Sequence, residues 1–227
     1  MTGQPLAREL RVREKLLTCG AQSLSDTELL AVFISSGSAN KSCVQLAHDL
    51  MKHLGDMRTV LNSDLDTFQQ VPGLGVVRYI QLQAVREICR RSDFISLQKD
   101  TQLTNTHATH AFLKRQLRDK KNETFVALFL DSQHRILCYE ELFTGTINTA
   151  TVYSRPIIER VMKHNAAALI IAHNHPSGLA DASSHDIAVT HRLREALALI
   201  DTQLLDHIVI GDNEVYSIMN DIKSRCH

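Results

Sequence analysis

A buried strand that ends in two histidines constrains this chain more than any other feature of its sequence. Residues 166–172 form an apolar run, which is followed directly by His173, Asn174, His175 and Pro176. Because side chains alternate along extended backbone, the two histidines point to the same side of the expected strand. Pro176 has no N–H group for a strand ladder, so we expect the strand to end there. The sequence therefore predicts a pair of imidazoles at a strand tip.

A turn and a helix start follow this strand. Gly178 lets the chain turn, and Ser183 can cap the next helix, with Asp186 three residues further on. The first turn of that helix brings a carboxylate back towards the two imidazoles. Two nitrogen ligands, one oxygen ligand and a free fourth position describe a catalytic zinc site, since a structural site is closed by four protein ligands. We therefore predict that His173, His175 and Asp186 bind Zn²⁺.

Each part of this pattern is common when it occurs alone. Most His-x-His pairs are ordinary surface or core histidines, and Ser-x-x-Asp is typical of a helix start. The combination is much narrower, because His-x-His-Pro, a glycine and Ser-x-x-Asp follow an apolar strand with seven residues between His175 and Ser183. The string resembles the JAMM (MPN-type) metalloprotease motif. With Asn174 in HNHPSG, it resembles the RadC family (UPF0758-type) of bacterial proteins, from RVREKLLTCGAQSLSDTELLA near the start to LLDHIVIG near the end.

The resemblance also implies catalytic roles around the predicted metal. Zinc lowers the pKa of a bound water to about 7, and a nearby carboxylate usually takes the proton. Three candidate carboxylates start or end neighbouring strands: Glu123, Glu140 and Glu141. JAMM proteins place their catalytic glutamate just before an apolar strand such as TFVALFL, so the resemblance selects Glu123 as general base. By the same resemblance, Ser183 donates a hydrogen bond to the oxyanion of the tetrahedral intermediate.

From Glu123 onwards the pattern predicts an α/β layer structure with a central sheet. Apolar and alternating runs predict strands at residues 123–131, 136–143, 149–153, 166–172, 203–211 and 214–218. Helices are expected at residues 107–118, 154–165 and 184–200. The resemblance implies a JAMM/MPN-like fold, in which helices flank a central mixed sheet. Within the strand LLDHIVIG, Asp206 and His207 are expected to pair locally or to support the sheet, with help to the metal ligands as the other possibility.

The first 91 residues predict a small all-α domain. Ser25 and Glu28 form a capping box that opens the helix DTELLAVFIS, which Gly37 is expected to end. Residues 71–75, Val-Pro-Gly-Leu-Gly, lie between two expected helices and resemble a helix-hairpin-helix module, which binds DNA phosphates. Arg78 lies in the first turn of the second helix. The alternative is a simple αα-hairpin that needs glycine for its turn.

Residues 92–105 show no convincing period and predict a linker between the helical domain, residues 1–91, and the α/β domain, residues 106–227.

Hydrophobic residues make up 44% of the 227 residues, which is ample for packed cores, and the formal net charge is zero. Without a net field, any contact with nucleic acid must come from a local patch.

The sequence predicts a cytoplasmic protein without a membrane span. Its apolar runs are too short to cross a bilayer, and the first residues lack the apolar core of a signal peptide. The odd number of cysteines and the lack of Cys-x-x-Cys spacing predict reduced, mostly buried thiols. These cysteines are Cys19, Cys43, Cys89, Cys138 and Cys226.

Two functional hypotheses from different classes follow. The first is a zinc-dependent JAMM-type hydrolase that acts on a peptide or isopeptide substrate. The alternative is a DNA-associated, repair-related protein that binds DNA through its N-terminal domain and has a non-peptidase metal site. Phosphodiester hydrolysis is less attractive, because many nucleases use two metals and this motif supplies one carboxylate ligand.

Overall fold

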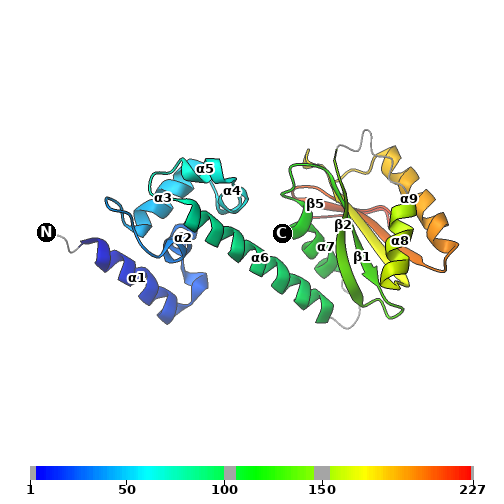
Figure 1. The fold of residues 1–227 in the computed structure, drawn as a ribbon, viewed down its shortest axis with the longest axis horizontal. Helices are drawn as coiled ribbons and strands as arrows, with labels where there is room; N and C mark the ends of the chain where they lie inside the picture. Colours follow the sequence, from blue (N-terminus) through cyan, green and yellow to red (C-terminus); the bar gives the residue numbers. More distant parts are fainter. Residues whose placement is uncertain (1–3, 100–105, 146–153, 226–227) are drawn as a thin grey trace. The chain divides into compact units, whose positions relative to one another are not determined.

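The chain folds into two compact units, Met1–Cys89 and Arg90–His227. The structure is a computed structural model that describes residues 4–99, 106–145 and 154–225 (Figure 1). No helix within these ranges is both long enough and apolar enough to span a membrane.

The first unit is helical, as expected from the capping signals. Ser25 opens α2 with a capping box, because its hydroxyl accepts from the Glu28 N–H at 3.3 Å and its own N–H donates to the Glu28 carboxylate at 2.9 Å. Helix α2 ends at Ile34, earlier than the predicted stop at Gly37, because Ser35 adopts a positive φ of 60°. The helices are α1 (Gln4–Cys19), α2 (Asp26–Ile34), α3 (Cys43–Leu54), α4 (Met57–Asn62), α5 (Leu65–Gln69) and α6 (Val76–Lys99), with the 3₁₀ turn η1 at Ala21–Ser23.

The helical unit has its own apolar core. The side chains of Leu46, Leu50, Val60 and Phe68 are almost completely buried in it. Helix α3 supplies Leu46 and Leu50, which lie four residues apart on one face of the helix. This unit therefore holds together by the burial of apolar residues from α2, α3, α4, α5 and α6.

The predicted linker at residues 92–105 is helical in its first part. Helix α6 continues to Lys99, and residues 100–105 lie outside the described residues. Phe94 and Leu97 pack into the core of the second unit beside Phe112, so tertiary packing stabilises a helix for which the local sequence shows no clear period.

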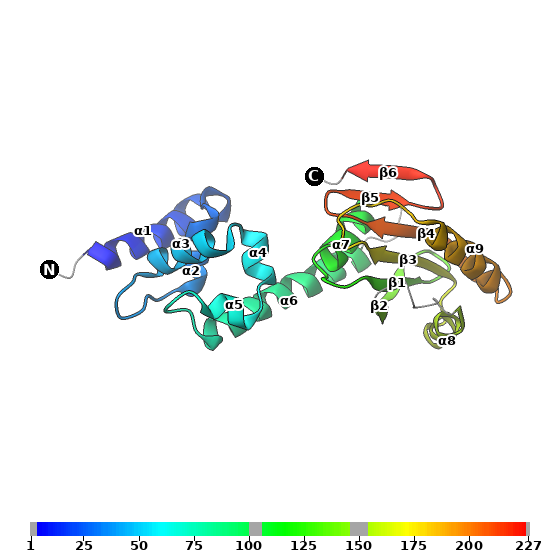
Figure 2. The same cartoon turned by 90° about the horizontal axis from the view of Figure 1, so that it is seen from above.

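The second unit contains a six-stranded mixed sheet in the order β2-β1-β3-β4-β5-β6 (Figure 2). Strands β3 and β4 are parallel, whereas the other neighbouring pairs are antiparallel. The strands are β1 (Thr124–Leu130), β2 (Ile136–Thr144), β3 (Ala168–Asn174), β4 (Gln203–Ile210), β5 (Glu214–Ser217) and β6 (Ile222–Arg225). The helices are α7 (Thr106–Leu117), α8 (Ser154–His164) and α9 (Ser184–Ala198). The predicted α/β fold with a central mixed sheet is confirmed.

Helices cover both faces of this sheet. Helix α7 packs on one face through Phe112, Leu113 and Leu117, while α8 and α9 pack on the other (Figure 1). Every residue of β1 and β3 is buried, because alternate side chains enter the two apolar layers. The sheet centre is therefore a dry environment in which any polar side chain needs a partner.

Some local expectations differ from the structure. Strand β6 has no counterpart among the predicted strands, since IKSR is short and mostly polar. The predicted strand at residues 149–153 lies outside the described residues.

The cysteines were expected to be mostly buried, which is wrong for Cys19 and Cys89, because both are exposed. Cys43 is buried and Cys138 is half-buried.

The packing on the α8 side predicts a large loss of stability in Phe129→Ala. Phe129 is fully buried and its ring centre lies 4.9 Å from that of His164, so truncation should cost about 3–5 kcal/mol of unfolding free energy. Leu137→Ala on the neighbouring strand is the control, since Leu137 is 39% exposed. Urea denaturation, with hydrogen exchange measured on β1 and β3 peptides, checks this. Equal stability of the two variants would contradict the assigned packing.

Candidate metal centre

The site begins at the tip of β3, where two polar residues face opposite sides of the sheet. His173 is completely buried on the side covered by α9, and Asn174 is buried on the side covered by α7. His175 follows the strand and donates its backbone N–H to the carbonyl of Ile210 at 3.0 Å, which holds the chain against β4 beyond the end of β3. Both histidines therefore start from well-fixed backbone.

The loop after His175 is pinned to the turn that follows β4. Gly178 takes a positive φ of 83°, as its predicted turn requires, and donates its N–H to the His175 carbonyl at 2.9 Å. Its own carbonyl accepts from the N–H of Asp212 at 2.8 Å. At Gly211 a Cβ atom would lie 2.6 Å from the Gly178 oxygen and 2.8 Å from the Ala180 nitrogen, so the two backbones can approach only because Gly211 has no side chain.

The carboxylate of Asp186 is fixed by the start of α9. Ser183 and Asp186 form the predicted capping box: the Ser183 N–H donates to Asp186 Oδ2 at 2.7 Å, and the Asp186 N–H donates to Ser183 Oγ at 3.2 Å. The Ser183 hydroxyl also donates to Oδ2, at 2.6 Å. These contacts hold one carboxylate oxygen and direct the other, Oδ1, to within 3.3 Å of His173 Nε2.

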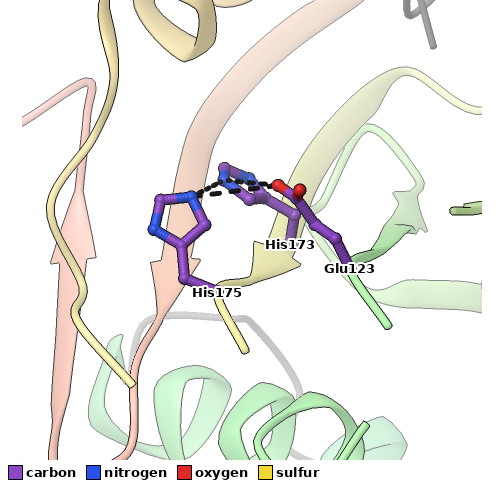
Figure 3. Close-up of side chains that lie close together, drawn as sticks. All are labelled: Glu123, His173 and His175. Atoms are coloured by element: carbon purple, nitrogen blue, oxygen red, sulfur yellow. Dashed lines mark hydrogen bonds and ion pairs between the residues drawn. The ribbon is translucent and has the colours of Figure 1, made fainter. Parts of the chain in front are cut away.

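Four side chains approach one another beside the end of β3. The Nε2 atoms of His173 and His175 are 3.0 Å apart, and Asp186 Oδ2 lies 3.9 Å from His175 Nε2. Glu123 reaches in from the residue before β1, with Oε1 3.8 Å from both Nε2 atoms. Figure 3 shows the Glu123 carboxylate and the two imidazoles turned towards one another.

Glu123, His173 and His175 place possible metal ligands within 4.8 Å of one another, and Asp186 Oδ1 lies beside His173. His175 Nδ1 lies 3.1 Å from the carbonyl oxygen of Leu179, which can only accept, so Nδ1 carries the hydrogen and Nε2 presents a lone pair to the site. The neighbours of that lone pair are His173 Nε2 and the carboxylate oxygens of Glu123 and Asp186. A cation can bind all of these atoms at once. At Zn–N distances of about 2.0–2.1 Å, tetrahedral ligand atoms stand roughly 3.3 Å apart. The 3.0 and 3.3 Å separations are close to this value, whereas those of 3.8 and 3.9 Å are longer.

Burial keeps the inner imidazoles neutral. It lowers the pKa of His173 to about 4, although the Asp186 carboxylate raises it, and it lowers the pKa of His207 well below its ordinary value. Neutral imidazole is the form that binds metals. The Phe125 ring stacks on His173 with 6.1 Å between ring centroids and contacts His207 edge-on with 5.5 Å between centroids. An apolar side chain therefore covers this side of the site.

Asn174 fixes the segment that carries Glu123. Its Oδ1 accepts from the N–H of Thr124 at 2.8 Å, and its Nδ2 donates to the carbonyls of Lys120 at 3.1 Å and Asn122 at 3.3 Å. One buried amide thus ties both sides of Glu123 to the strand that carries the histidines. Sequence reasoning missed this role, because Asn174 and Asn122 lie 52 residues apart in the chain.

The two other candidate carboxylates contact different partners in the second unit. Glu140 pairs with Arg160 and with His164, the latter at 2.6 Å, and Glu141 pairs with Lys120 at 2.8 Å. Glu140, His164 and Cys138 also place possible metal ligands within 4.8 Å of one another. Because Arg160 already contacts that carboxylate, we interpret this group as the ion pair that joins β2 to α8.

The remaining predicted residues are placed as follows. His185 and His191, two further histidines of α9, are exposed. Ser183 is exposed at the start of α9, and its hydroxyl hydrogen is directed to Asp186. Donation to an oxyanion would require that hydroxyl to rotate, so this role stays a prediction.

Arg78, in the segment that resembles a DNA-binding hairpin, contacts backbone carbonyls. Its guanidinium donates to the Gly73 carbonyl, to the Ser36 carbonyl at 2.7 Å and to the Gly37 carbonyl at 3.3 Å. Gly73 has a positive φ of 99°, as the tight turn requires. The contacts agree with the αα-hairpin interpretation, in which Arg78 joins the hairpin to the loop after α2. DNA binding by this unit stays a prediction.

The Asn174 contacts predict that Asn174→Asp loosens the residues around Glu123. The carboxylate would lose both donors and face the carbonyl oxygens of Lys120 and Asn122, at a cost of about 2 kcal/mol or more. Hydrogen exchange in the peptide that contains residues 118–125 should accelerate, while the exposed Asn213→Asp should leave it unchanged. Unaltered exchange in Asn174→Asp would show that the amide does not hold this segment.

The Arg78 contacts predict that Arg78→Lys destabilises the helical unit by about 1–2 kcal/mol, because a lysine cannot reach three carbonyls at once. A phosphate-contact role would instead keep stability, since the positive charge remains. Thermal unfolding compares it with Arg11→Lys, an exposed arginine of the same unit. Wild-type stability combined with weaker DNA binding would favour the DNA hypothesis.

Comparisons with known proteins cover nearly the whole chain. The family described as UPF0758 N-terminal matches residues 4–80, and the family described as RadC-like JAB domain matches residues 103–223. A UPF0758 protein of Legionella pneumophila (strain Corby) is 68% identical over 221 residues, which is 97% of each chain. UPF0758 proteins of Halorhodospira halophila and Cellvibrio japonicus are 49% and 48% identical, over 93% and 92% of this chain and 94% and 93% of theirs.

The second unit therefore carries a RadC-like JAB domain, which suggests a JAMM/MPN-type metallohydrolase fold, and the resemblance found in the sequence is confirmed. With identity this high over the full length of its relatives, the chain belongs to the UPF0758 family.

Proposed function

We propose that this protein is a zinc-dependent hydrolase that cleaves a peptide or isopeptide bond with an activated water. The observation that carries the proposal is the convergence of His173 Nε2, His175 Nε2, Asp186 Oδ1 and a second carboxylate, Glu123, at one point. Two imidazoles and one carboxylate hold the metal in many catalytic zinc sites, and a further carboxylate beside them suits proton transfer.

Asp186 is the better ligand and Glu123 the better base. The Asp186 side chain is 6% exposed and is held by the capping box, so Oδ1 is fixed towards His173. The Glu123 side chain is 17% exposed and lies beside both imidazoles, nearer to solvent. A base needs access to water, whereas a ligand needs a fixed position, and this difference supports the proposed division of roles.

Each of these residues would have a different role in the reaction. Zinc, when bound, supplies the Lewis acidity that makes water a nucleophile near neutral pH. Glu123 accepts the proton of the attacking water and passes it to the leaving nitrogen. Phe125 and the buried sheet exclude bulk water from the inner side, which strengthens the electrostatic contacts made there. Ser183, at the start of α9, is the proposed donor to the oxyanion once its hydroxyl turns from Asp186.

The proposal predicts that metal binding and catalysis can be separated by mutation. His173→Ala and Asp186→Asn should lose zinc, as measured by elemental analysis of the purified protein. Glu123→Gln should keep zinc and lose roughly 10²–10⁴-fold in kcat on the best substrate from a peptide and isopeptide screen. Glu141→Gln, which removes a carboxylate paired with Lys120, should keep both properties.

Addition of a chelator to the wild-type protein should abolish cleavage, and zinc should restore it. Equal zinc content in the wild type and in His173→Ala would overturn the ligand assignment. Cleavage that survives in Glu123→Gln would remove this residue as general base while leaving the metal site in place.

A further inference from the structure

A chain of buried hydrogen bonds leads from α9 through β4 to the inner metal ligand. Thr190 Oγ1 donates to the carbonyl of Asp186 at 2.6 Å and lies 2.6 Å from Nδ1 of His207. The other ring nitrogen of His207, Nε2, lies 2.9 Å from Nδ1 of His173. All three side chains are at most 2% exposed, so no solvent competes for these bonds.

The donor and acceptor of each hydrogen bond in this chain follow from the Asp186 carbonyl, which can only accept. The Thr190 hydroxyl has one hydrogen, and that hydrogen goes to the Asp186 carbonyl, so Oγ1 accepts from His207 Nδ1. A neutral imidazole has one N–H group, which leaves His207 Nε2 as an acceptor. His173 must then donate from Nδ1, and its lone pair is on Nε2, the atom that faces His175 and Asp186.

We propose that Thr190 and His207 are positioning residues that hold His173 in the Nδ1–H tautomer, so that its Nε2 is permanently ready to bind the metal. This inference rests on the proposed function, since it concerns a ligand of the same zinc site. The reverse polarity, in which Thr190 donates to His207 and His207 donates to His173, would place a hydrogen on Nε2 of His173. A protonated nitrogen has no lone pair for a metal, so the polarity of the relay decides whether the site is competent.

The two metal-binding histidines are oriented by independent means. The Leu179 carbonyl fixes the tautomer of His175 through a backbone contact at 3.1 Å, whereas a hydroxyl and a second imidazole fix that of His173. A carbonyl cannot change its direction of hydrogen bonding, but a hydroxyl can rotate. The relay is therefore the part of the site where one side-chain substitution can alter the tautomer, and His175 serves as an internal reference.

The test uses Thr190→Val, which keeps the shape of the side chain and removes its hydroxyl. In the metal-free wild-type protein, ¹⁵N NMR of the histidine rings should show a protonated Nδ1 and an unprotonated Nε2 for His173. In Thr190→Val, His207 loses the acceptor for its Nδ1–H, and His173 should shift towards the Nε2–H tautomer while His175 stays unchanged. Thr190→Ser retains a hydroxyl and should restore the wild-type pattern.

Zinc affinity gives a second measurement that does not depend on activity. Competition with a chromophoric chelator should show affinity 10–100-fold lower in Thr190→Val, the usual loss when a group that orients a ligand is removed. Thr190→Ser should bind close to the wild-type value. The matched control is Thr202→Val, because Thr202 is a buried threonine of the same unit that lies beside Ala166 and Ile200 instead.

Loss of folding is controlled by a second pair of variants. If circular dichroism shows that Thr190→Val is unfolded, His207→Gln and His207→Leu replace it: glutamine retains an acceptor for His173 Nδ1–H, and leucine does not. The proposal expects zinc affinity to be higher in His207→Gln than in His207→Leu. Equal affinities would overturn it.

The outcomes separate this inference from the proposed hydrolase. A His173 ring that carries its hydrogen on Nε2 in the wild-type protein, or a tautomer and zinc affinity that are unchanged in Thr190→Val, would overturn the relay and leave the hydrolase standing. A wild-type protein with the expected tautomer and zinc affinity, but no cleavage of any peptide or isopeptide, would leave the relay standing and remove the hydrolase.

Discussion

Burial of β3 on both faces is the constraint on which the site depends. A central strand covered by helices on either side cannot leave a polar side chain without a partner, because an unpaired polar group in such a place costs several kcal/mol. The two polar residues at the end of the strand, His173 and Asn174, therefore each have hydrogen-bond partners of their own. Those partners hold the histidine ring and the residues around Glu123 in place.

The two faces of β3 consequently perform different tasks at one location. On the α9 side, His173 contacts His207 and points Nε2 towards His175 and Asp186. On the α7 side, Asn174 holds the backbone before β1, from which Glu123 extends to the same point. The proposed ligand His173 and the proposed base Glu123 are thus both positioned by one buried strand. Catalytic geometry is best kept by residues on such elements, because small displacements of the reacting groups cost rate.

The sequence predicted the parts of this arrangement that depend on local geometry. Alternation along a strand placed His173 and His175 on one side, and a capping box placed Asp186 in the first turn of a helix. Strand register and long-range pairing decided the rest. The parallel pairing of β3 with β4 sets His207 opposite Ile171, and its ring reaches His173, which is 34 positions away in the chain. Packing likewise extended α6 through residues expected to form a linker, and carbonyls at Ser36 and Gly37 engaged Arg78.

The contact between His175 and the carbonyl of Leu179 has a further consequence. The metal-binding orientation of that ring depends on a main-chain atom, which every amino acid supplies, while the Leu179 side chain is 61% exposed. Residue 179 can consequently be exchanged for polar, charged or bulky alternatives without removing the acceptor that orients the imidazole. The orientation of the proposed ligand His175 is therefore insulated from side-chain variation at position 179.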